Sequence, residues 1–206
     1  MSVPHITSKP MEIGLMLFNE VEVLDFAGPF EVFSLAEYPA TKTKCFRVAT
    51  ISERDELLSA RNGLKVRADF RFDNHPQLDG LIVPGGYGAE QIEIKNRTAL
   101  DWLRRVAAQT PLVASVCTGV FLLAESGVLS NETVTTHHLD RQDLKARYPA
   151  LNVVGETKFV DGGKIVTSGG ISAGIEMSLY LVARLVGRDI AEATARRTEY
   201  NWQQRK

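Results

Sequence analysis

Cys117 is the residue of this chain whose type and position are best suited to chemistry. An apolar, β-branched run, Pro111 to Val116, leads directly into it, and Thr118-Gly119 opens an apolar segment with helical spacing. A cysteine at such a strand-to-helix junction lies on a tight turn near the positive end of a helix, which favours the nucleophilic thiolate. A buried, inert cysteine is the alternative interpretation of the same pattern.

Two glycines, Gly85 and Gly86, follow another apolar run, Gly80 to Pro84. Without side chains they let the backbone approach a ligand closely. Their N–H groups, together with that of Thr118, could hold a developing oxyanion. An ordinary turn would use the same two residues.

Asp25 lies a few residues beyond the first apolar run, at the predicted start of a helix. An acid in this place is commonly a helix cap or a residue of the first turn. Beside a thiol, however, the pKa of its carboxyl group would be raised, and it could act as a general acid or base.

His137 and His138 end a threonine-rich stretch, and a glycine-containing segment, 168–171, precedes a long apolar helix. The N–H groups of Gly170 and Ile171 could line a pocket, although a flexible turn would look the same. Solvated histidines at a strand end are the alternative for both histidines, and we favour it for His138. We therefore count His137, Gly170 and Ile171 as possible substrate-binding residues.

The segments that must position these residues alternate between short apolar runs and helical patterns. We predict strands at Glu12–Phe18, Phe46–Ser52, Gly80–Pro84, Pro111–Val116, Glu132–Thr136, Val153, Lys158–Val160 and Lys164–Thr167, with two short strands around the turn Asn62-Gly63. We predict helices at Asp25–Glu37, with Pro29 in the first turn, and at Arg97–Gln109, Thr118–Ser126, Asp140–Arg147, Ser172–Val186 and from Asp189 toward Glu199.

This alternation predicts an α/β three-layer sandwich, a flavodoxin-like arrangement with a mainly parallel central sheet covered on both faces. Ligands bind outside the carboxyl ends of the strands in such sheets. That rule selects three loops, which carry Asp25, Gly85-Gly86 and Cys117.

The composition excludes several classes of function. The 206 residues carry a net charge of −1 and contain no cluster of basic residues, so we expect neither nucleic-acid binding nor attraction to an anionic membrane. The uncharged stretch 106–124 contains Pro111, which argues against a membrane helix. Two cysteines make no disulfide framework, so a reducing, cytoplasmic setting is expected. We expect residues 1–10 to be a loose tail without a signal peptide, followed by one domain over 11–206.

These motifs together resemble the ThiJ/PfpI superfamily, whose members have the class I glutamine amidotransferase-like fold. The matching segments are GLMLFNEVEVLDFAGPFEVF (14–33), GLIVPGGYG (80–88), ASVCTGVFLLAESGVL (114–129), TVTTHHLDR (133–141) and VTSGGISAGIEMSLYLV (166–182). Within the superfamily, the chain is most similar to isonitrile hydratases and to the amidase-like domains of AraC-type regulators. Leu24-Asp25, Gly28-Pro29 and Cys117-Thr118-Gly119 carry this closer likeness.

The resemblance implies a role for each candidate residue. Cys117 corresponds to the nucleophile, Asp25 to the acid that contacts it, and Thr118 to its active-site neighbour. Gly85-Gly86 corresponds to the oxyanion site, and His137 to a histidine that lies near the cysteine in some members. The implied reaction is hydration of an isonitrile to an N-substituted formamide through a Cys117 thioimidate, without metal or organic cofactor.

The resemblance also sets expectations for partners and for alternatives. Thr118 stands where protease-like and many deglycase-like members place histidine, so peptidase activity is not expected. A homodimer is implied, and apolar positions between Phe26 and Phe33 support it. The helix-turn-helix region of the AraC-type regulators is not expected within this chain, so neither is DNA binding. A redox or small-ligand sensing module, and an amidase or glyoxalase-like enzyme, remain open as alternatives.

Overall fold

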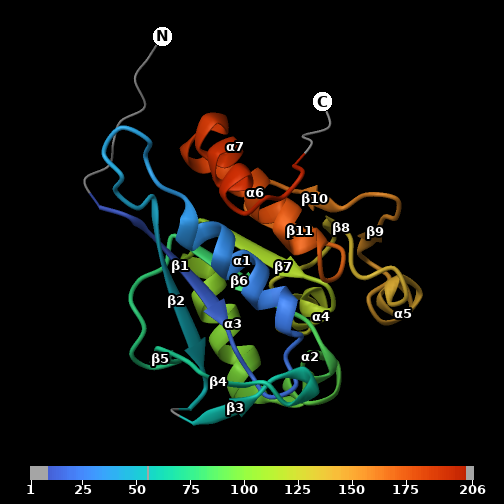
Figure 1. The fold of residues 1–206 in the computed structure, drawn as a ribbon. Helices are drawn as coiled ribbons and strands as arrows, with labels where there is room; N and C mark the ends of the chain where they lie inside the picture. Colours follow the sequence, from blue (N-terminus) through green and yellow to red (C-terminus); the bar gives the residue numbers. More distant parts are fainter. Residues whose placement is uncertain (1–8, 55, 203–206) are drawn as a thin grey trace.

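The computed structural model describes residues 9–54 and 56–202 and shows a three-layer α/β sandwich (Figure 1). The strands of its central sheet are β1 (Met11–Met16), β2 (Phe46–Ser52), β5 (Phe70–Arg71), β6 (Gly80–Val83), β7 (Leu112–Val116), β10 (Phe159–Asp161) and β11 (Ile165–Ser168). Their order is β10-β11-β7-β6-β1-β2-β5, and all neighbours are parallel except β10 and β11. The mainly parallel sheet predicted from the sequence is therefore confirmed.

The middle of the sheet is shielded from solvent because helices cover both of its faces. Every residue of β6 and β7 is buried, and so is every residue of β1 after Met11. These strands read as nearly continuous apolar runs in the sequence, as expected when neither face meets water. Apolar burial of this extent holds the edge of the sheet that carries the candidate site in a fixed place.

Two groups of helices form the outer layers of the sandwich. The helices are α1 (Val23–Leu35), α2 (Tyr87–Gln91), α3 (Arg97–Gln109), α4 (Gly119–Glu125), α5 (Arg141–Arg147), α6 (Ala173–Val186) and α7 (Arg188–Arg197). On one face, α1, α6 and α7 pack around a cluster that includes Phe33 and Met177. On the other face, α3 and α4 pack around a cluster that includes Trp102 and Phe121.

Four short strands lie outside the central sheet, namely β3 (Leu57–Ser59), β4 (Lys65–Arg67), β8 (Thr133–Val134) and β9 (Asn152–Val153). The predicted turn at Asn62-Gly63 joins β3 to β4, and both residues have the left-handed dihedrals that such a turn requires. The strand predicted at Glu132–Thr136 is shorter than expected. Its last two residues leave the strand because Thr135 N–H donates to Thr167 Oγ1 and the Thr136 hydroxyl donates to the Cys117 carbonyl.

Helix α1 differs from the prediction at its start. It begins at Val23, two residues before Asp25, so Pro29 lies in the second turn and not in the first. The spacing of Phe26, Phe30 and Phe33 suggested one buried face. Phe26 and Phe33 are buried, but Phe30 is 38% exposed.

Helix α2 was not predicted at all, because its five residues are too short for a periodic pattern.

Residues 1–8 of the expected tail lie outside the described ranges, and β1 begins at Met11. The uncharged stretch 106–124 ends α3, forms β7 and begins α4. Within the described residues, no helix has both the length and the apolar run needed to cross a bilayer.

Candidate active site

The order of the strands brings three loops together at the carboxyl edge of the sheet. Strand β6 lies between β1 and β7, so the loop after β6, which contains Gly85, separates Asp25 from Cys117. A side chain at residue 85 would keep the other two apart. A Cβ atom there would stand 2.5 Å from Thr118 N and 3.0 Å from Cys117 Cβ. Glycine therefore permits the contact between an acid and a thiol from strands that are not neighbours.

Cys117 occupies the sharp turn that the sequence predicted. Its φ is +56°, a left-handed value that is uncommon for a residue with a side chain. The surrounding chain fixes this conformation, because the Cys117 N–H is shared between the carbonyls of Ser168 and Gly169, both at 3.2 Å. The Thr136 hydroxyl holds the Cys117 carbonyl at 2.9 Å. The side chain is 7% exposed at the edge of an open cavity.

Asp25 is fully buried and anchored from two sides. Its Oδ2 atom accepts a hydrogen bond from Gly85 N–H at 3.1 Å, and its Oδ1 atom accepts one from Ile171 N–H at 3.0 Å. It is the third residue of α1, and the residue at the N-cap of that helix is Glu22. Asp25 is therefore an acid of the first turn, as one of the alternatives had it, and not a helix cap, because its carboxyl group accepts hydrogen bonds from other loops.

Burial dominates the protonation of both groups. Removal from water raises the pKa of Asp25 to about 7, although its hydrogen bonds from Gly85 and Ile171 and its interaction with Cys117 oppose the rise. Burial, and then the charge of Asp25, also raise the pKa of the Cys117 thiol well above its usual range. The expected stabilisation of a thiolate by the following helix is therefore outweighed. The resting thiol keeps its proton, and the Asp25 carboxyl group interacts with it.

The two glycine N–H groups that were predicted to form an oxyanion site already have partners. Gly85 N–H donates to Asp25, and Gly86 N–H donates to Thr118 Oγ1 at 3.0 Å. Their role is structural in this arrangement, because each orients a side chain of the site. The N–H of Thr118 is directed at the Cys117 sulfur, where it favours negative charge. It is the donor best placed to meet charge that develops during a reaction.

His137 lies beside the thiol, across Gly170. A Cβ atom at residue 170 would stand 2.4 Å from His137 Cδ2 and 3.1 Å from Cys117 Sγ, so ring and thiol border the same small space. The His137 Nδ1 atom is 3.0 Å from Asp140 Oδ2, which orients the ring. The His138 ring lies beside that of His137 in a tilted arrangement, with the ring centroids 4.4 Å apart, but His138 is exposed to solvent.

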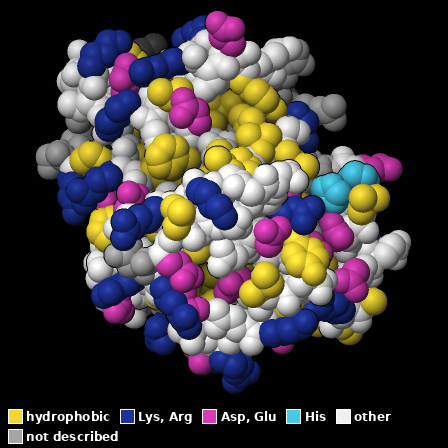
Figure 2. Space-filling model, turned by 60° about the horizontal axis from the view of Figure 1, so that its bottom comes forward, with side chains coloured by type: hydrophobic (Ala, Val, Ile, Leu, Met, Phe, Trp, Pro, Cys, Tyr) yellow, Lys and Arg dark blue, Asp and Glu magenta, His cyan; other side chains and the backbone are white. Residues whose placement is uncertain are grey.

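An open cavity of about 230 Å³ lies over the thiol. Five of the predicted residues line it, namely Gly86, Cys117, Thr118, His137 and Ile171. Sequence reasoning missed the five other lining residues, which are Glu22, Arg61, Tyr87, Glu90 and Asp140. Tyr87 follows the glycine pair directly and Glu90 comes three residues later, which was the available signal for them. Figure 2 shows histidine side chains at the right of the surface, with Asp and Glu side chains near them.

Comparisons with known proteins agree with this geometry. The model of the DJ-1/PfpI family matches residues 11–184. An isonitrile hydratase of Pseudomonas putida is 34% identical over 92% of this chain and 78% of its own length. The transcriptional regulator GbdR of Pseudomonas aeruginosa is 27% identical over 93% of this chain, which spans about half of the regulator (51%). A crystal structure of a ThiJ/PfpI family protein from Pseudomonas syringae superposes with a TM-score of 0.82 at 21% identity, covering 100% of this chain and 84% of that one.

Proposed function

The chain belongs to the DJ-1/PfpI family, and on this premise we propose that it is a cysteine-dependent hydro-lyase that converts isonitriles to N-substituted formamides. The observation that carries the proposal is the buried pair of Cys117 and Asp25. The thiol supplies a nucleophile, and the acid, whose pKa is about 7, is able both to accept and to donate a proton at neutral pH. The similarity to an isonitrile hydratase over most of both chains supports this choice of substrate class.

Isonitrile chemistry needs a nucleophile and a proton at the same carbon atom. In the proposed reaction, Asp25 accepts the thiol proton while Cys117 Sγ bonds to the terminal isonitrile carbon. Asp25 then gives that proton to the carbon, which leaves a neutral thioimidate, Cys–S–CH=N–R. Water adds to the thioimidate carbon and one of its protons passes to nitrogen. The C–S bond then breaks, the second water proton returns to sulfur, and the formamide R–NH–CHO leaves.

The other residues of the site have supporting roles in this proposal. Negative charge that develops at the sulfur or at the attacked carbon is stabilised by the N–H of Thr118. His137, oriented by Asp140, borders the space above the thiol and contacts the substrate there. The Asp25 carboxyl group cannot turn away from the thiol, because Gly85 and Ile171 hold one oxygen each.

The test is a substrate panel of alkyl isonitriles, amides and 2-oxoaldehydes. We expect the protein to form formamides from the isonitriles. The rate of hydration should fall on the order of 10⁴-fold in Cys117→Ala and at least about 10²-fold in Asp25→Ala. The matched control is Cys45→Ala, which removes the other cysteine and should hydrate isonitriles at the parental rate. Turnover of amides or oxoaldehydes alone would instead assign the amidase or glyoxalase-like alternative. Equal rates for Cys117→Ala and the parent protein would overturn the proposal.

A non-catalytic sensing module is the second candidate, and the similarity to a transcriptional regulator favours it. In that case Cys117 binds or senses a small molecule without turnover. Intact-mass analysis after mild peroxide treatment tests a redox form of this role. Oxidation of Cys117 in a protein that turns over no member of the panel would support sensing, whereas modification of Cys45 alone would argue against it.

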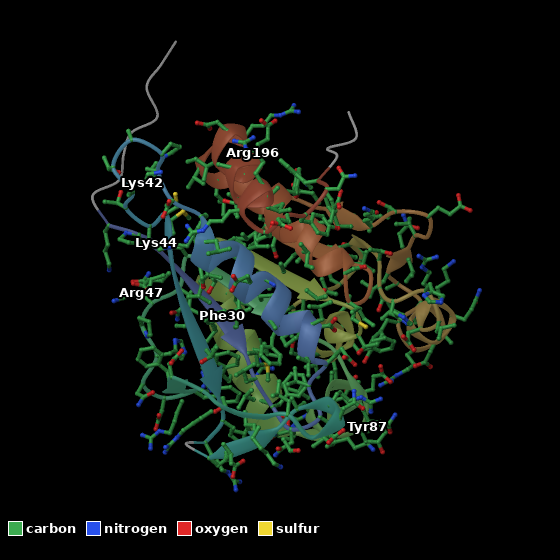
Figure 3. The ribbon with its side chains drawn as sticks, in the orientation of Figure 1. Phe30, Lys42, Lys44, Arg47, Tyr87 and Arg196 are labelled. Carbon is green, nitrogen blue, oxygen red and sulfur yellow. The ribbon has the colours of Figure 1, made fainter. Side chains whose placement is uncertain are left out.

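We further propose that the protein is a homodimer that uses the exposed apolar residues of α1. Leu24 and Phe30 are 36% and 38% exposed, and Figure 3 shows Phe30 on that helix. Sedimentation at micromolar concentration should show twice the chain mass of 22.8 kDa. A Phe30→Glu variant should shift the equilibrium toward the monomer. A parent protein that sediments at the mass of one chain would contradict this proposal.

A further inference from the structure

The cavity over Cys117 has an unequal charge distribution. Three carboxyl groups line it, those of Glu22, Glu90 and Asp140, against one guanidinium, that of Arg61. His137 also lines the cavity, but its ring nitrogen is already paired with Asp140. Cys117 lines the same cavity, so a molecule that reaches its thiol through the cavity comes near these groups.

The positive charge of Arg61 is compensated before a ligand arrives. Its guanidinium lies 3.9 Å from a carboxylate oxygen of Glu20 and 3.9 Å from one of Glu22. It also lies over the ring of Tyr87, with its carbon 5.9 Å from the centroid. Arg61 is therefore held at the rim in a pair with two acids, and it gives the cavity no free positive charge for an anionic ligand.

Glu90 has no such ion pair, although His137 interacts with it favourably. Among the described residues, no lysine or arginine forms an ion pair with it, and its partner is the hydroxyl of Thr118, the residue next to the nucleophile. Desolvation, together with the charges of Asp140 and Asp143, raises the pKa of Glu90. An incoming cation stabilises a carboxylate that is partly desolvated and near other acids. Such a carboxylate also repels an incoming anion more strongly than an exposed carboxylate does.

The rim of the cavity also offers apolar surface. Tyr87 is 52% exposed and Ile171 is 41% exposed, and both line the cavity with Cys117. Figure 3 shows Tyr87 at the lower end of the molecule, where α2 lies. A ligand with an apolar body therefore finds contacts here, while its charged group meets Glu90 and Asp140.

We propose that the substrate of this cavity carries a positively charged group, such as an alkylammonium, and that Glu90 is the residue that selects it. The inference rests on the proposed function only in taking Cys117 as the reacting atom. It assigns to Glu90 a specificity role that is separate from the proton transfer by Asp25. Its test therefore needs one readout that does not depend on turnover.

That readout is the rate at which charged methanethiosulfonates modify Cys117. The thiol displaces methanesulfinate and forms a mixed disulfide. The transferred group carries a trimethylammonium or a sulfonate, and a smaller neutral methyl reagent reports the basal reactivity of the thiol. The rates are measured on the Cys45→Ala protein at about pH 8 and low salt, and divided by the rates for a small thiol in solution. We expect a normalised preference for the cation over the anion on the order of tenfold or more.

The variant Glu90→Gln should reduce this cation-to-anion ratio several-fold, and high salt should reduce it in the parent protein. The matched control is Glu192→Gln, which neutralises an exposed acid on α7 whose partner is Arg188, and it should keep the parental ratio. An anionic reagent that reacts as fast as the cationic one would overturn the proposal. A ratio that stays the same in Glu90→Gln would also overturn it.

Turnover gives the second readout. Isonitriles of equal chain length that end in a tertiary amine, a methyl group or a carboxylate should show kcat/KM values in that order, with about tenfold between the first and the last. If none of the three is hydrated, the proposed function fails, and the reagent ratios still decide whether the cavity selects cations. If all three are hydrated equally, the charge selection fails and the hydratase proposal stands.

Discussion

The two cysteines of this chain lie at opposite ends of the central sheet and make a useful comparison. Cys45 precedes β2 at the amino end, in the region where Figure 3 labels Lys44 and Arg47, and Cys117 follows β7 at the carboxyl end. Both are buried, with 2% and 7% of their surfaces exposed. Burial raises the pKa of both thiols, that of Cys45 to about 11 and that of Cys117 further. Neither burial nor pKa therefore marks a reactive cysteine here.

The surroundings of the two thiols are what differ. Cys45 sits in an apolar cluster, and its N–H and carbonyl continue ordinary backbone pairing with Ala36 and Met11. Cys117 sits on a left-handed turn beside a buried acid and under an open cavity. The proposed reaction needs a partner that accepts the proton and access for a substrate, and of the two cysteines Cys117 is the one beside an acid and an open cavity.

Serine at each position should separate activity from stability. Cys117→Ser should lose on the order of 10³-fold or more in turnover, because a hydroxyl is a far weaker nucleophile with the same acid beside it. Cys45→Ser should keep turnover within about twofold, but should lose about 1–3 kcal/mol of unfolding free energy, because its hydroxyl is buried among apolar groups. Steady-state kinetics and urea unfolding measure the two effects. Comparable losses of turnover in both variants would remove the distinction between the cysteines.

The pH profile should show the acid that distinguishes Cys117. The Asp25 carboxylate accepts the thiol proton, so kcat/KM should fall about tenfold per pH unit below the pKa of about 7 and level off above it. Asp25→Asn should lose about 10²-fold at pH 8 and should lack this limb, because an amide takes up no proton in this range. A parental profile that is flat between about pH 5 and about pH 8 would exclude Asp25 as the base.

Glycine at residue 85 keeps the acid and the thiol in contact, and alanine should weaken that contact. The Cβ atom of an alanine at residue 85 would lie 2.5 Å from Thr118 N, so the loop after β6 must move. We expect Gly85→Ala to lose about 10- to 100-fold in kcat/KM and about 1–3 kcal/mol of unfolding free energy. The control is Gly162→Ala, whose Cβ atom would have Ile165 O, at 3.2 Å, as its neighbour. Parental kinetics in Gly85→Ala would show that this close approach is not needed.

The order of alkylation gives the smallest but most direct test of the comparison. By pKa alone, Cys45 would be the first to react with iodoacetamide. We expect Cys117 to react about tenfold faster at neutral pH, because Asp25 accepts its proton and the cavity admits the reagent. Peptide mapping over time distinguishes the two sites, and unfolding in urea should remove the difference. Faster labelling of Cys45 in the native protein would contradict the role given to Asp25.

Sequence reasoning selected the loops that meet in the candidate site, because the rule for parallel sheets needs only strand ends. It selected the loops of Asp25, Gly85 and Cys117, and the structure places all three together. The turn at Cys117 was also foreseen, since a buried strand that runs into Thr118-Gly119 leaves few other conformations. These predictions depend on short-range patterns and on one topological rule.

The remaining features depend on three-dimensional neighbours that no local pattern encodes. The helix that follows Cys117 was expected to favour a thiolate, but burial and the charge of Asp25 raise the pKa of the thiol. The glycine N–H groups were expected to be available, but Asp25 and the Thr118 hydroxyl take them. Glu90 was missed because it lies in a helix of five residues that shows no periodicity.

The hydrogen bond from Ile171 N–H to Asp25 Oδ1 joins residues that are 146 positions apart in the chain. The bond from Gly85 N–H to the same carboxyl group spans 60 positions. Contacts of such long range form after most of the chain has been arranged, because the entropy of closing the loops opposes them until the sheet supports them. During refolding, the helices and the outer strands should therefore recover first, and the acid and the thiol should meet late. In this protein, catalytic competence would report that the last long-range contacts of the fold have formed.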